Sequence, residues 1–252
     1  MLTVKRHGTD LHFDDDGFTE TPYVYRTLTA GRVYEEQFLE HIRALDRSGV
    51  YVDIGAHLGT HTVWFASVCA ATHVHAFEPV SRFAGVVQRN VTANDLEGRV
   101  TLHRVGLSDQ AGRATNRLSP EHQMGFMADA IATDESFDIV RLDDVIGRQP
   151  IAVIKLDVEG MEAAALRGAG RILSKWRPVV YAEAHTPEDV AEIEQALLPY
   201  GYRATGKVFN ASPTYEFTAP ARKGTERLRP LWHRLPARWR QSLGRALSRR
   251  LR

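Results

Sequence analysis

The sequence is poor in cysteine and in long apolar runs. Cys69 is the only cysteine among 252 residues, so no disulfide can form within the chain. A disulfide-stapled secreted scaffold is therefore excluded, and a reducing compartment is favoured. No segment approaches the ~18 apolar residues of a membrane span, and residues 1–7 lack the apolar stretch of a signal peptide. We therefore expect a cytoplasmic protein.

The low net charge of +1 conceals an uneven distribution of charge. Residues 221–252 contain eleven Lys or Arg and one acid, Glu226, which gives this tail a charge of +10. Residues 1–220 then carry a charge of −9. Such asymmetry predicts that an acidic body and a basic tail meet different partners.

Short β-branched runs alternate with helical patterns through most of the body. This alternation is typical of an α/β protein with a parallel sheet. The expected strands are residues 50–54, 73–77, 99–105, 151–157 and 178–183, and the expected helices are 32–47, 60–71, 81–94, 159–175 and one beginning at 187. Short hairpins are expected in 1–30, small strands and loops in an insertion at 107–150, and an antiparallel pair at 201–207 and 214–218. We expect three parts: a cap on the acceptor side (1–49), the main domain (50–220) and the basic tail (221–252).

The first strand ends in the segment VDIGAHLG, residues 52–59. Its glycines, Gly55 and Gly59, flank a tight turn into a helix and permit close approach of the backbone. A dinucleotide-binding turn would instead have the spacing G-x-G-x-x-G. The acid Asp53 would repel phosphate but suits a cation, which points to the ammonium and sulfonium groups of S-adenosylmethionine (SAM).

Two further strand ends carry polar residues. Glu78 and Pro79 follow the second strand, nineteen residues after Gly59, a spacing at which a carboxylate accepts hydrogen bonds from ribose hydroxyls. Because NAD sites share this feature, it supports a nucleoside ligand in general. Ser108 and Asp109 follow the third strand and could contact an adenine edge.

The most apolar strand ends in KLDVEG, residues 155–160. Ligands of open α/β sheets bind at the carboxyl ends of the strands, where the strand order reverses. Asp53 and Asp157 would both project there if their strands are neighbours. Lys155 lies within the buried run, which argues against an incidental surface lysine.

Together these segments resemble the FkbM family of SAM-dependent methyltransferases. The resemblance covers about residues 31–205, and its most specific part is the stretch K-x-D-V-E-G-x-E at 155–162. It implies a Rossmann-like, class I fold with a seven-stranded, mostly parallel sheet and an antiparallel last strand, and O-methylation of hydroxyls on sugars, glycans, lipid-linked glycans or polyketides. His57 departs from the Asn more usual in the family. The expected cofactor-binding residues are Asp53, Gly55, Ala56, His57, Gly59, Glu78, Pro79, Ser108, Asp109 and Asp157.

Methyl transfer to a hydroxyl needs a positioned acceptor and gains from a base that takes its proton. Asp157, Glu159 and His185 all follow strands at the expected site, and His185 titrates in the range that suits a base. Asp157 could instead hold the methionine part of SAM, and His185 could simply precede a helix. The sequence leaves these roles open.

Other assignments have weaker support. The histidine spacings lack an H-E-x-x-H pattern and paired cysteines, so we expect no metal, although magnesium held by carboxylates stays open. The missing G-x-G-x-x-G argues against an NAD-dependent oxidoreductase. Cys69 lacks the Pro-Cys context of cytosine methylation, and residues 157–159 lack the Asx-Pro-Pro-aromatic pattern of amino methyltransferases, which argues against nucleic acid as a partner. An RNA methyltransferase that uses its tail as a clamp, and a non-catalytic protein of the same fold, remain alternatives.

The tail combines a helical stripe of Trp239, Leu243, Leu247 and Leu251 with arginines around it. Arginine-rich helices with Trp and Leu on one face lie in membrane interfaces. We therefore expect peripheral contact with an anionic membrane on its inner face. Docking on the acidic body, binding of an anionic polymer and disorder are the other interpretations.

Overall fold

The computed structural model describes residues 1–15, 21–115 and 136–220. Its main sheet has seven strands: β3 (Gly49–Ile54), β4 (Ala71–Phe77), β5 (Val100–His103), β9 (Ile151–Leu156), β10 (Val179–Glu183), β11 (Arg203–Phe209) and β12 (Thr214–Thr218). They lie in the order β11-β12-β10-β9-β3-β4-β5. β12 is antiparallel to both of its neighbours, whereas the pairs from β10 to β5 are parallel. The predicted mostly parallel sheet with an antiparallel last strand is confirmed.

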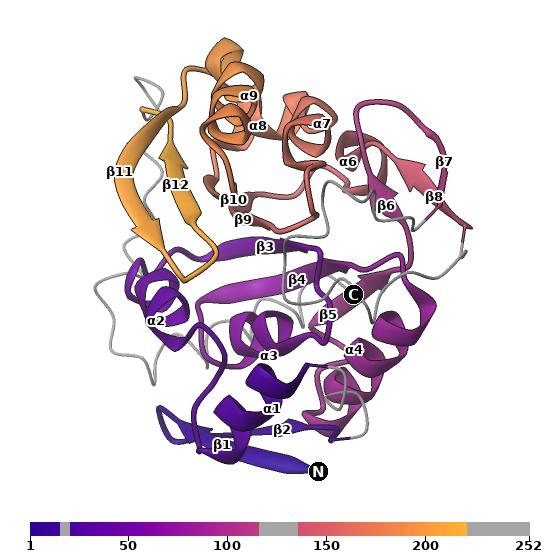
Figure 1. Ribbon diagram of the computed structural model, residues 1–252, viewed down its shortest axis with the longest axis vertical. Helices are drawn as coiled ribbons and strands as arrows, with labels where there is room; N and C mark the ends of the chain where they lie inside the picture. The colour runs from indigo at the N-terminus through magenta and orange to yellow at the C-terminus, as the bar shows by residue number, and fades with distance from the viewer. Residues whose placement is uncertain (16–20, 116–135, 221–252) are drawn as a thin grey trace, which may run out of the picture. The chain divides into compact units, whose positions relative to one another are not determined.

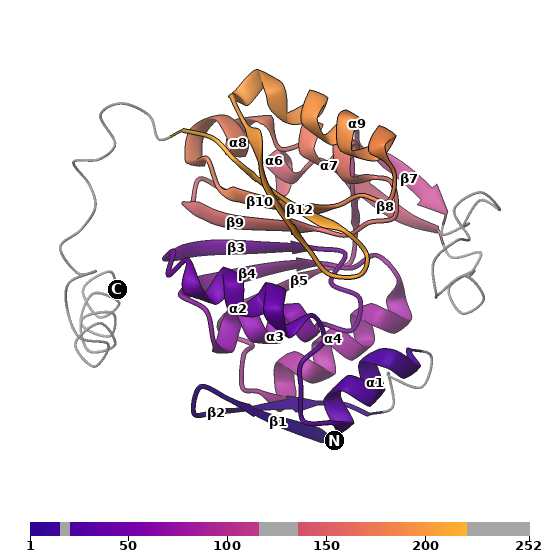
Figure 2. The same ribbon diagram turned by 60° about the vertical axis from the view of Figure 1, so that its left-hand side comes forward.

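Helices cover both faces of this sheet (Figures 1 and 2). One face carries α2 (Glu36–Ala44), α3 (Thr60–Ser67) and α4 (Ser81–Ala93), and the other carries α6 (Leu142–Val145), α7 (Glu162–Arg167), α8 (Gly170–Trp176) and α9 (Pro187–Leu197). A short 3₁₀ helix, Leu198–Tyr200, follows α9. The alternation of strands and helices in the sequence therefore produces a three-layer arrangement.

Side chains of the central strands alternate between the two faces, as the two-residue period of a strand requires. Tyr51 and Val153 join the apolar core beneath α2, α3 and α4, whereas Val52 and Ile154 join the core beneath α6 to α9. This alternation places Asp53, two residues after Tyr51, on the α3 face of the sheet. All residues of β3 and β9 are buried, so the polar side chains among them are held inside the protein.

An N-terminal hairpin of β1 (Leu2–Arg6) and β2 (Thr9–Phe13) lies outside α3 and α4 (Figure 1). Asn94 and Asn90 of α4 attach it: Asn94 exchanges hydrogen bonds of 2.9 and 2.7 Å with the backbone of His12, and Asn90 accepts one of 2.7 Å from Asp14 N. Asn90 Nδ2 also donates to Leu58 O at 2.7 Å, which connects the hairpin to the turn after β3.

Of the one or two short hairpins predicted in residues 1–30, one forms, β1–β2, and the second half of the segment contains a helix instead. Residues Pro22–Thr29 form the helix α1, which begins with a proline in its first turn and buries Val24 and Leu28. Proline suits that position because its missing N–H has no partner there anyway. The helix was overlooked because one eight-residue helix shows too few periodic positions to stand out.

Three predicted helices were too long. The helix expected at 32–47 covers only Glu36–Ala44. The helix expected at 60–71 ends at Ser67, and β4 begins at Ala71. The helix expected at 159–175 starts at Glu162 and is divided into α7 and α8. It divides at Gly168, where a Cβ atom would lie 2.1 Å from Ser108 O, so the close approach of the 107–109 segment sets the break.

The insertion at 107–150 contains a three-stranded sheet of β6 (Gly106–Leu107), β8 (Ser136–Val140) and β7 (Gly112–Thr115), in that order, followed by α6. Residues 116–135 of the insertion and the basic tail lie outside the described residues. Within residues 1–15, 21–115 and 136–220, no helix combines the length and apolarity needed to cross a membrane.

A buried carboxylate fastens α2 to the C-terminal hairpin. Glu216 on β12 is 3% exposed and accepts hydrogen bonds from His41 of α2, from Tyr181 and from Thr205, at 2.7 to 2.9 Å. Lys207 Nζ lies 3.1 Å from it. Burial alone would raise the pKa of Glu216, but these donors outweigh it and lower the pKa to about 2.

We expect Glu216→Gln to lower the free energy of unfolding by about 2 kcal/mol at pH 7. A carboxyl group whose pKa is lower in the folded state stabilises the fold above its unfolded pKa of about 4.5. This contribution is lost as the pH falls from about 4.5 to about 2. Urea unfolding at pH 7 and pH 3 measures it, and a variant that differs from wild type equally at both pH values would contradict the assignment.

Candidate active site

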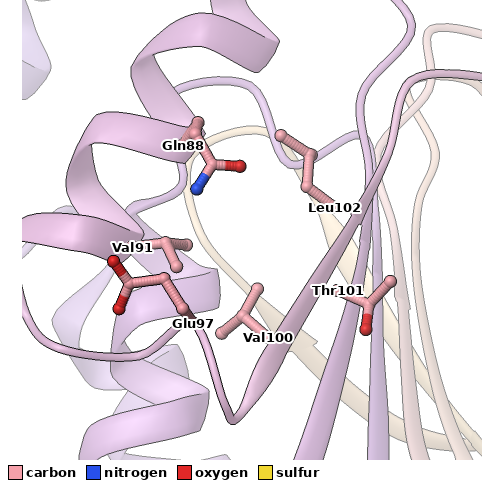
Figure 3. A pocket seen from close by; sticks show the side chains of 6 residues that line it. All are labelled: Gln88, Val91, Glu97, Val100, Thr101 and Leu102. Carbon is pink, nitrogen blue, oxygen red and sulfur yellow. The ribbon is translucent and has the colours of Figure 1, made fainter.

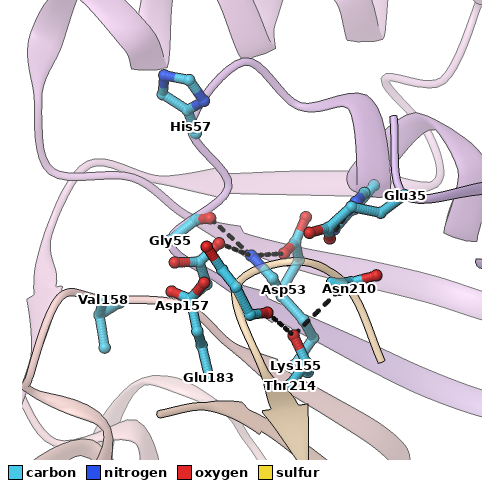
Figure 4. Close-up of polar contacts among 12 residues, drawn as sticks. Glu35, Asp53, Gly55, His57, Lys155, Asp157, Val158, Glu183, Asn210 and Thr214 are labelled. Carbon is cyan, nitrogen blue, oxygen red and sulfur yellow. Dashed lines mark hydrogen bonds and ion pairs between the residues drawn. The ribbon is translucent and has the colours of Figure 1, made fainter. Parts of the chain in front are cut away.

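Lys155 is the centre of a charged cluster at the carboxyl ends of β3, β9 and β10 (Figure 4). It is 4% exposed and pairs in register with Asp53 across β3 and β9, so the two strands are neighbours as the site prediction required. Its ammonium lies 3.5 Å from Asp53 Oδ1 and 3.5 Å from Asp157 Oδ2, and donates to Gly55 O at 3.0 Å. Burial alone would lower the pKa of Lys155, but the surrounding carboxylates raise it, so the lysine stays charged.

Asp53 is fully buried, and one of its oxygens lacks a hydrogen-bond donor among the described residues. Thr62 of α3 donates to Oδ2 at 2.5 Å, whereas Oδ1 forms an ion pair with the ammonium of Lys155 at 3.5 Å and accepts no shorter hydrogen bond from the described residues. Burial raises the pKa of Asp53, and Lys155 and Thr62 counteract this effect. Because its nearest donor is 3.5 Å away, Oδ1 can accept a further hydrogen bond from a cationic or N–H group of a ligand.

Asp157 and Glu183 form an acid pair at the open side of the cluster. Burial would raise both pKa values, but Lys155 and a hydrogen bond from Glu183 lower that of Asp157 to about 2. The pKa of Glu183 rises to about 10, through burial and the charge of Asp157. Glu183 is therefore protonated and donates a hydrogen bond to Asp157. The side chain of Asp157 is 40% exposed and accessible to a ligand.

Sequence reasoning missed Glu35, which the N-terminal segment places beside this cluster (Figure 4). Its side chain is 12% exposed, and Oε2 lies 3.3 Å from Nε2 of the buried His61 on α3. Burial and the charge of Asp157 raise the pKa of Glu35 to about 7, against the effects of Lys155 and a hydrogen bond with Tyr34. Glu35 reaches this position because its own backbone is left-handed, with φ of 56°. The sequence does not indicate such a bend, because glutamate rarely adopts this conformation.

The turn after β3 is supported by Glu78, which follows β4. The Glu78 carboxylate is 5% exposed and accepts hydrogen bonds from His57 N at 2.8 Å and from Val80 N at 3.0 Å. Burial raises its pKa to about 7 despite these donors. Gly55, with φ of 75°, is required by the fold itself, since a Cβ atom there would lie 1.8 Å from Asp157 O.

The rest of this turn packs tightly. Ala56 is 6% exposed, and Gly59 is the N-cap of α3, with φ of 76° and Val87 close behind it. The His57 ring lies 4.4 Å from the ring of Phe83, and its Nε2 is buried without a hydrogen-bond partner among the described residues. Burial lowers the pKa of His57 to about 4, so it is neutral at pH 7.

The loop after β9 is closed by Glu162, a second residue whose role the sequence did not reveal. Glu162 is 4% exposed and accepts hydrogen bonds from Val158 N at 2.9 Å and from Gly160 N at 3.1 Å. The positive φ angles of Glu159 and Gly160, 50° and 91°, delay the start of α7. The final acid of the stretch 155–162 therefore shapes the loop that presents Asp157.

His185 and Glu159 lie together at the exposed rim of the cluster. His185 follows β10, its side chain is 48% exposed, and Nε2 lies 3.5 Å from Glu183 and 4.0 Å from Glu159. Its backbone N–H donates to Asp189 at 3.1 Å, in the capping box with which Thr186 starts α9. The structure thus brings together the three residues considered as bases, His185, Asp157 and Glu159.

Ser108 and Asp109 do not follow the third strand of the main sheet, β5, as expected; they follow β6, a strand of the small separate sheet. Ser108 is buried and donates to Asp109 Oδ1 at 3.3 Å. Asp109 also accepts from Arg167 of α7 at 2.9 Å, so this carboxylate faces α7. No contact joins Asp109 to Lys155 within the parts of the chain described here.

Three further histidines, His73, His75 and His103, pack against each other. His75 Nδ1 lies 2.9 Å from His103 Nε2, and the rings of His73 and His75 are 5.0 Å apart. Burial and mutual repulsion lower the pKa of His75 to about 4. Among the residues described, no three His, Cys, Asp or Glu side chains are arranged to hold a metal ion.

Two surface hollows lie outside the charged cluster. One, of about 260 Å³, lies between α4 and β5 and is lined by Gln88, Val91, Glu97, Val100, Thr101 and Leu102 (Figure 3). The other, of about 220 Å³, is polar and lies beside Pro79, Arg104 and Arg113. Neither includes a cluster residue, so we place the site by its chemistry, at the carboxyl ends of the strands, where ligands of open α/β sheets bind.

Comparison with known proteins gives a clear family. Residues 53–204 match the model of the methyltransferase FkbM domain. The chain belongs to the FkbM family. It is 26% identical over 216 residues to the methyltransferase sdnD of Sordaria araneosa, an alignment that covers 70% of this chain and 83% of that protein.

Two solved structures resemble the fold of this FkbM methyltransferase. The FkbM methyltransferase of Methylobacillus flagellatus shares 21% identity with a TM-score of 0.54, over 82% of this chain and 56% of that chain. The present chain thus spans little more than half the length of that relative. A precorrin-6y C5,15-methyltransferase of Geobacter metallireducens shares 16% identity with a TM-score of 0.50, over 82% and 97% of the two chains.

The family makes this protein a SAM-dependent methyltransferase, and the cluster fits that cofactor. SAM carries an ammonium and a sulfonium, and the carboxylates around Lys155 outnumber its single positive charge. Asp53 Oδ1, whose nearest donor is Lys155 Nζ at 3.5 Å, and the partly exposed Asp157 are suited to hold the ammonium. Glu78, which also accepts hydrogen bonds from His57 N and Val80 N, is suited to the ribose hydroxyls.

Proposed function

We propose that this FkbM methyltransferase methylates a hydroxyl group of a sugar, glycan, lipid-linked glycan or polyketide. The observation that carries the proposal is the pairing of His185 with Glu159 and Glu183 at the exposed rim of the cluster. A hydroxyl oxygen becomes a better nucleophile as its proton leaves, and a histidine 4.0 Å from the carboxylate of Glu159 and 3.5 Å from the protonated Glu183 is suited to accept that proton. An acceptor that needs no deprotonation would make no use of this pair.

When bound, SAM supplies an electrophilic methyl group on a positively charged sulfur. The protein holds the hydroxyl in line with that methyl group and excludes competing water, which accounts for much of the rate gain. His185 takes the hydroxyl proton at Nε2, and the carboxylate of Glu159 stabilises the resulting imidazolium. The hydrogen bond from its backbone N–H to Asp189 fixes the start of α9 and thereby the position of His185.

Transfer of labelled methyl groups from SAM into fractionated cell glycans, lipids and small molecules tests the proposal. We expect an alkali-stable methyl ether in the product, and His185→Gln to lower the rate by about 100-fold with SAM affinity changed less than about threefold. His73→Gln, at a half-buried position of β4 away from the cluster, is the matched control and should retain the rate. Label found on nitrogen or carbon would refute O-methylation.

We further propose that the basic tail, residues 221–252, binds anionic membranes. This part rests on the sequence alone: each basic residue near an anionic surface contributes about 1 kcal/mol. In sedimentation with vesicles that contain phosphatidylserine, and therefore carry a negative surface, the full chain should pellet with the vesicles and a chain ending at Pro220 should stay in the supernatant. Equal binding of both chains would refute the proposal, and salt-sensitive binding of RNA by the tail would favour the RNA-binding alternative.

A further inference from the structure

The polar hollow of about 220 Å³ beside Pro79 has no part in the charged cluster around Lys155. Three elements supply its hydrogen-bond donors: Arg104 directly follows β5, Arg113 lies on β7, and Ser81 is the first residue of α4. The lining is completed by Pro79, Ser136, Phe137 and Asp138. Because residues 1–220 carry a net charge of −9, two arginines around one hollow reverse the sign of the body locally.

The two guanidinium groups of the hollow are accessible to a ligand. No hydrogen bond or ion pair joins the exposed Arg104 to another residue of the described ranges. Arg113 is 70% exposed and donates a hydrogen bond to Ser136 Oγ at 2.7 Å. The acid in the lining is Asp138, whose carboxylate is 67% exposed and lies 3.9 Å from Arg113 Nε. An exposed pair at that distance interacts weakly, so Asp138 offsets only part of the positive charge.

The start of α4 adds a positive helix end to the same hollow. α4 is thirteen residues long, Ser81–Ala93, and its N-cap is Val80, whose side chain cannot accept a hydrogen bond. Its first turn, 81–84, contains no acid, so the helix itself provides no carboxylate against the positive end of its dipole. Helix amides and arginines are both common partners of phosphate, and here they converge from separate elements.

We propose that this hollow binds a phosphate group carried by the acceptor. SAM contains no phosphate, so the cofactor does not account for such a site. The hollow adjoins the cofactor side of the protein, because Pro79 in its lining directly follows Glu78, whose carboxylate supports the turn after β3. The inference rests on the proposed O-methylation, and among those acceptors it favours phosphorylated sugars and glycans linked to lipid through phosphate.

Titration of the full-length protein with inorganic phosphate, followed by its amide NMR signals, tests the site without turnover. Residue-resolved signals are needed because the basic tail also attracts phosphate. We expect the amide signals of Ser81 and Arg113 to shift and to reach saturation. In Arg104→Gln, binding measured at these signals should weaken by about tenfold, as loss of a charge-assisted hydrogen bond predicts. The side chain of Arg104 is exposed, so its replacement leaves the fold intact.

Two further variants separate a specific site from general attraction of anions. Asp138→Asn removes the opposing carboxylate and should strengthen phosphate binding about twofold. Arg148→Gln is the matched control, since Arg148 is an exposed arginine shortly before β9, at the opposite edge of the sheet, and its loss should change nothing at the hollow. Equal phosphate binding by wild type and Arg104→Gln, or equal weakening in Arg148→Gln, would overturn the proposal.

Methyl transfer into the acceptor fraction distinguishes a phosphate on the acceptor from free phosphate. We expect Arg104→Gln to raise the acceptor KM about tenfold while kcat and SAM affinity change less than about threefold. Inorganic phosphate should inhibit the wild type in competition with the acceptor and not with SAM. Phosphate binding that leaves the acceptor KM unchanged in Arg104→Gln would indicate a site for free phosphate and overturn the proposal. Label on nitrogen or carbon would refute O-methylation instead, whereas the phosphate titration still decides whether the site exists.

Discussion

Replacing Lys155 by methionine is expected to lower the free energy of unfolding by about 4 kcal/mol, measured by urea denaturation at pH 8. Methionine fills similar volume, so the loss arises from charge and not from a cavity. Asp53 is fully buried and Asp157 is partly so, and both rely on the ammonium 3.5 Å away. When the lysine of a buried ion pair is removed, the carboxylates either stay charged without a partner or take up a proton, and both outcomes cost free energy.

The pH dependence of this loss separates an electrostatic cause from a packing cause. Without Lys155, the folded pKa of Asp53 lies further above its unfolded value, so the folded state binds more protons than the unfolded state. Stability of the variant therefore falls as the pH rises through that window. We expect a smaller difference from wild type at pH 5 than at pH 8. The exposed Lys5→Met should stay within about 0.5 kcal/mol of wild type, and a pH-independent loss in Lys155→Met would contradict the charge argument.

Asp53→Asn is expected to weaken SAM binding by about 100-fold, equivalent to about 2.7 kcal/mol. The substitution keeps the shape of the side chain and the acceptor for Thr62, but it removes the charge and can place an N–H where Oδ1 now lacks a donor. Because SAM and S-adenosylhomocysteine (SAH) share the ammonium, both should weaken together.

Calorimetry with SAM and SAH measures the effect, and Asp95→Asn serves as control on an exposed aspartate with a left-handed backbone that asparagine also favours. The variant should fold, because Asp157 still pairs with Lys155. If Asp53→Asn bound SAM as tightly as wild type, the ammonium site would have to lie elsewhere in the cluster.

Much of the site was predictable because its residues follow strands. A short β-branched run ending in an acid or a glycine marks the edge of a parallel sheet, and Asp53, Glu78, Asp157 and His185 all lie at such ends. The pairing of β3 with β9 joins residues about one hundred positions apart, and the buried Lys155 was a sign of it.

The parts that escaped prediction depend on backbone geometry or on long-range contacts. Glu35 reaches the cluster because its own backbone is left-handed. Glu162 accepts hydrogen bonds from the backbone amides of Val158 and Gly160, which precede it in the chain. Neither feature has a period along the chain. The helix predicted over 159–175 starts later, at Glu162, for the same reason. The positive φ angles of Glu159 and Gly160 belong to the loop that Glu162 closes, and helix propensity does not predict them.

The order of the strands also affects how the protein folds. β12, the last strand within the described residues, lies inside the sheet between β10 and β11, and its Phe217 is 1% exposed. During synthesis the backbone edge of β10 therefore stays unpaired until residues 214–218 have been made. An open edge beside a buried strand invites pairing with other chains. A chain interrupted before Thr214 should accordingly aggregate or be degraded, whereas one interrupted after Thr218 can close its sheet.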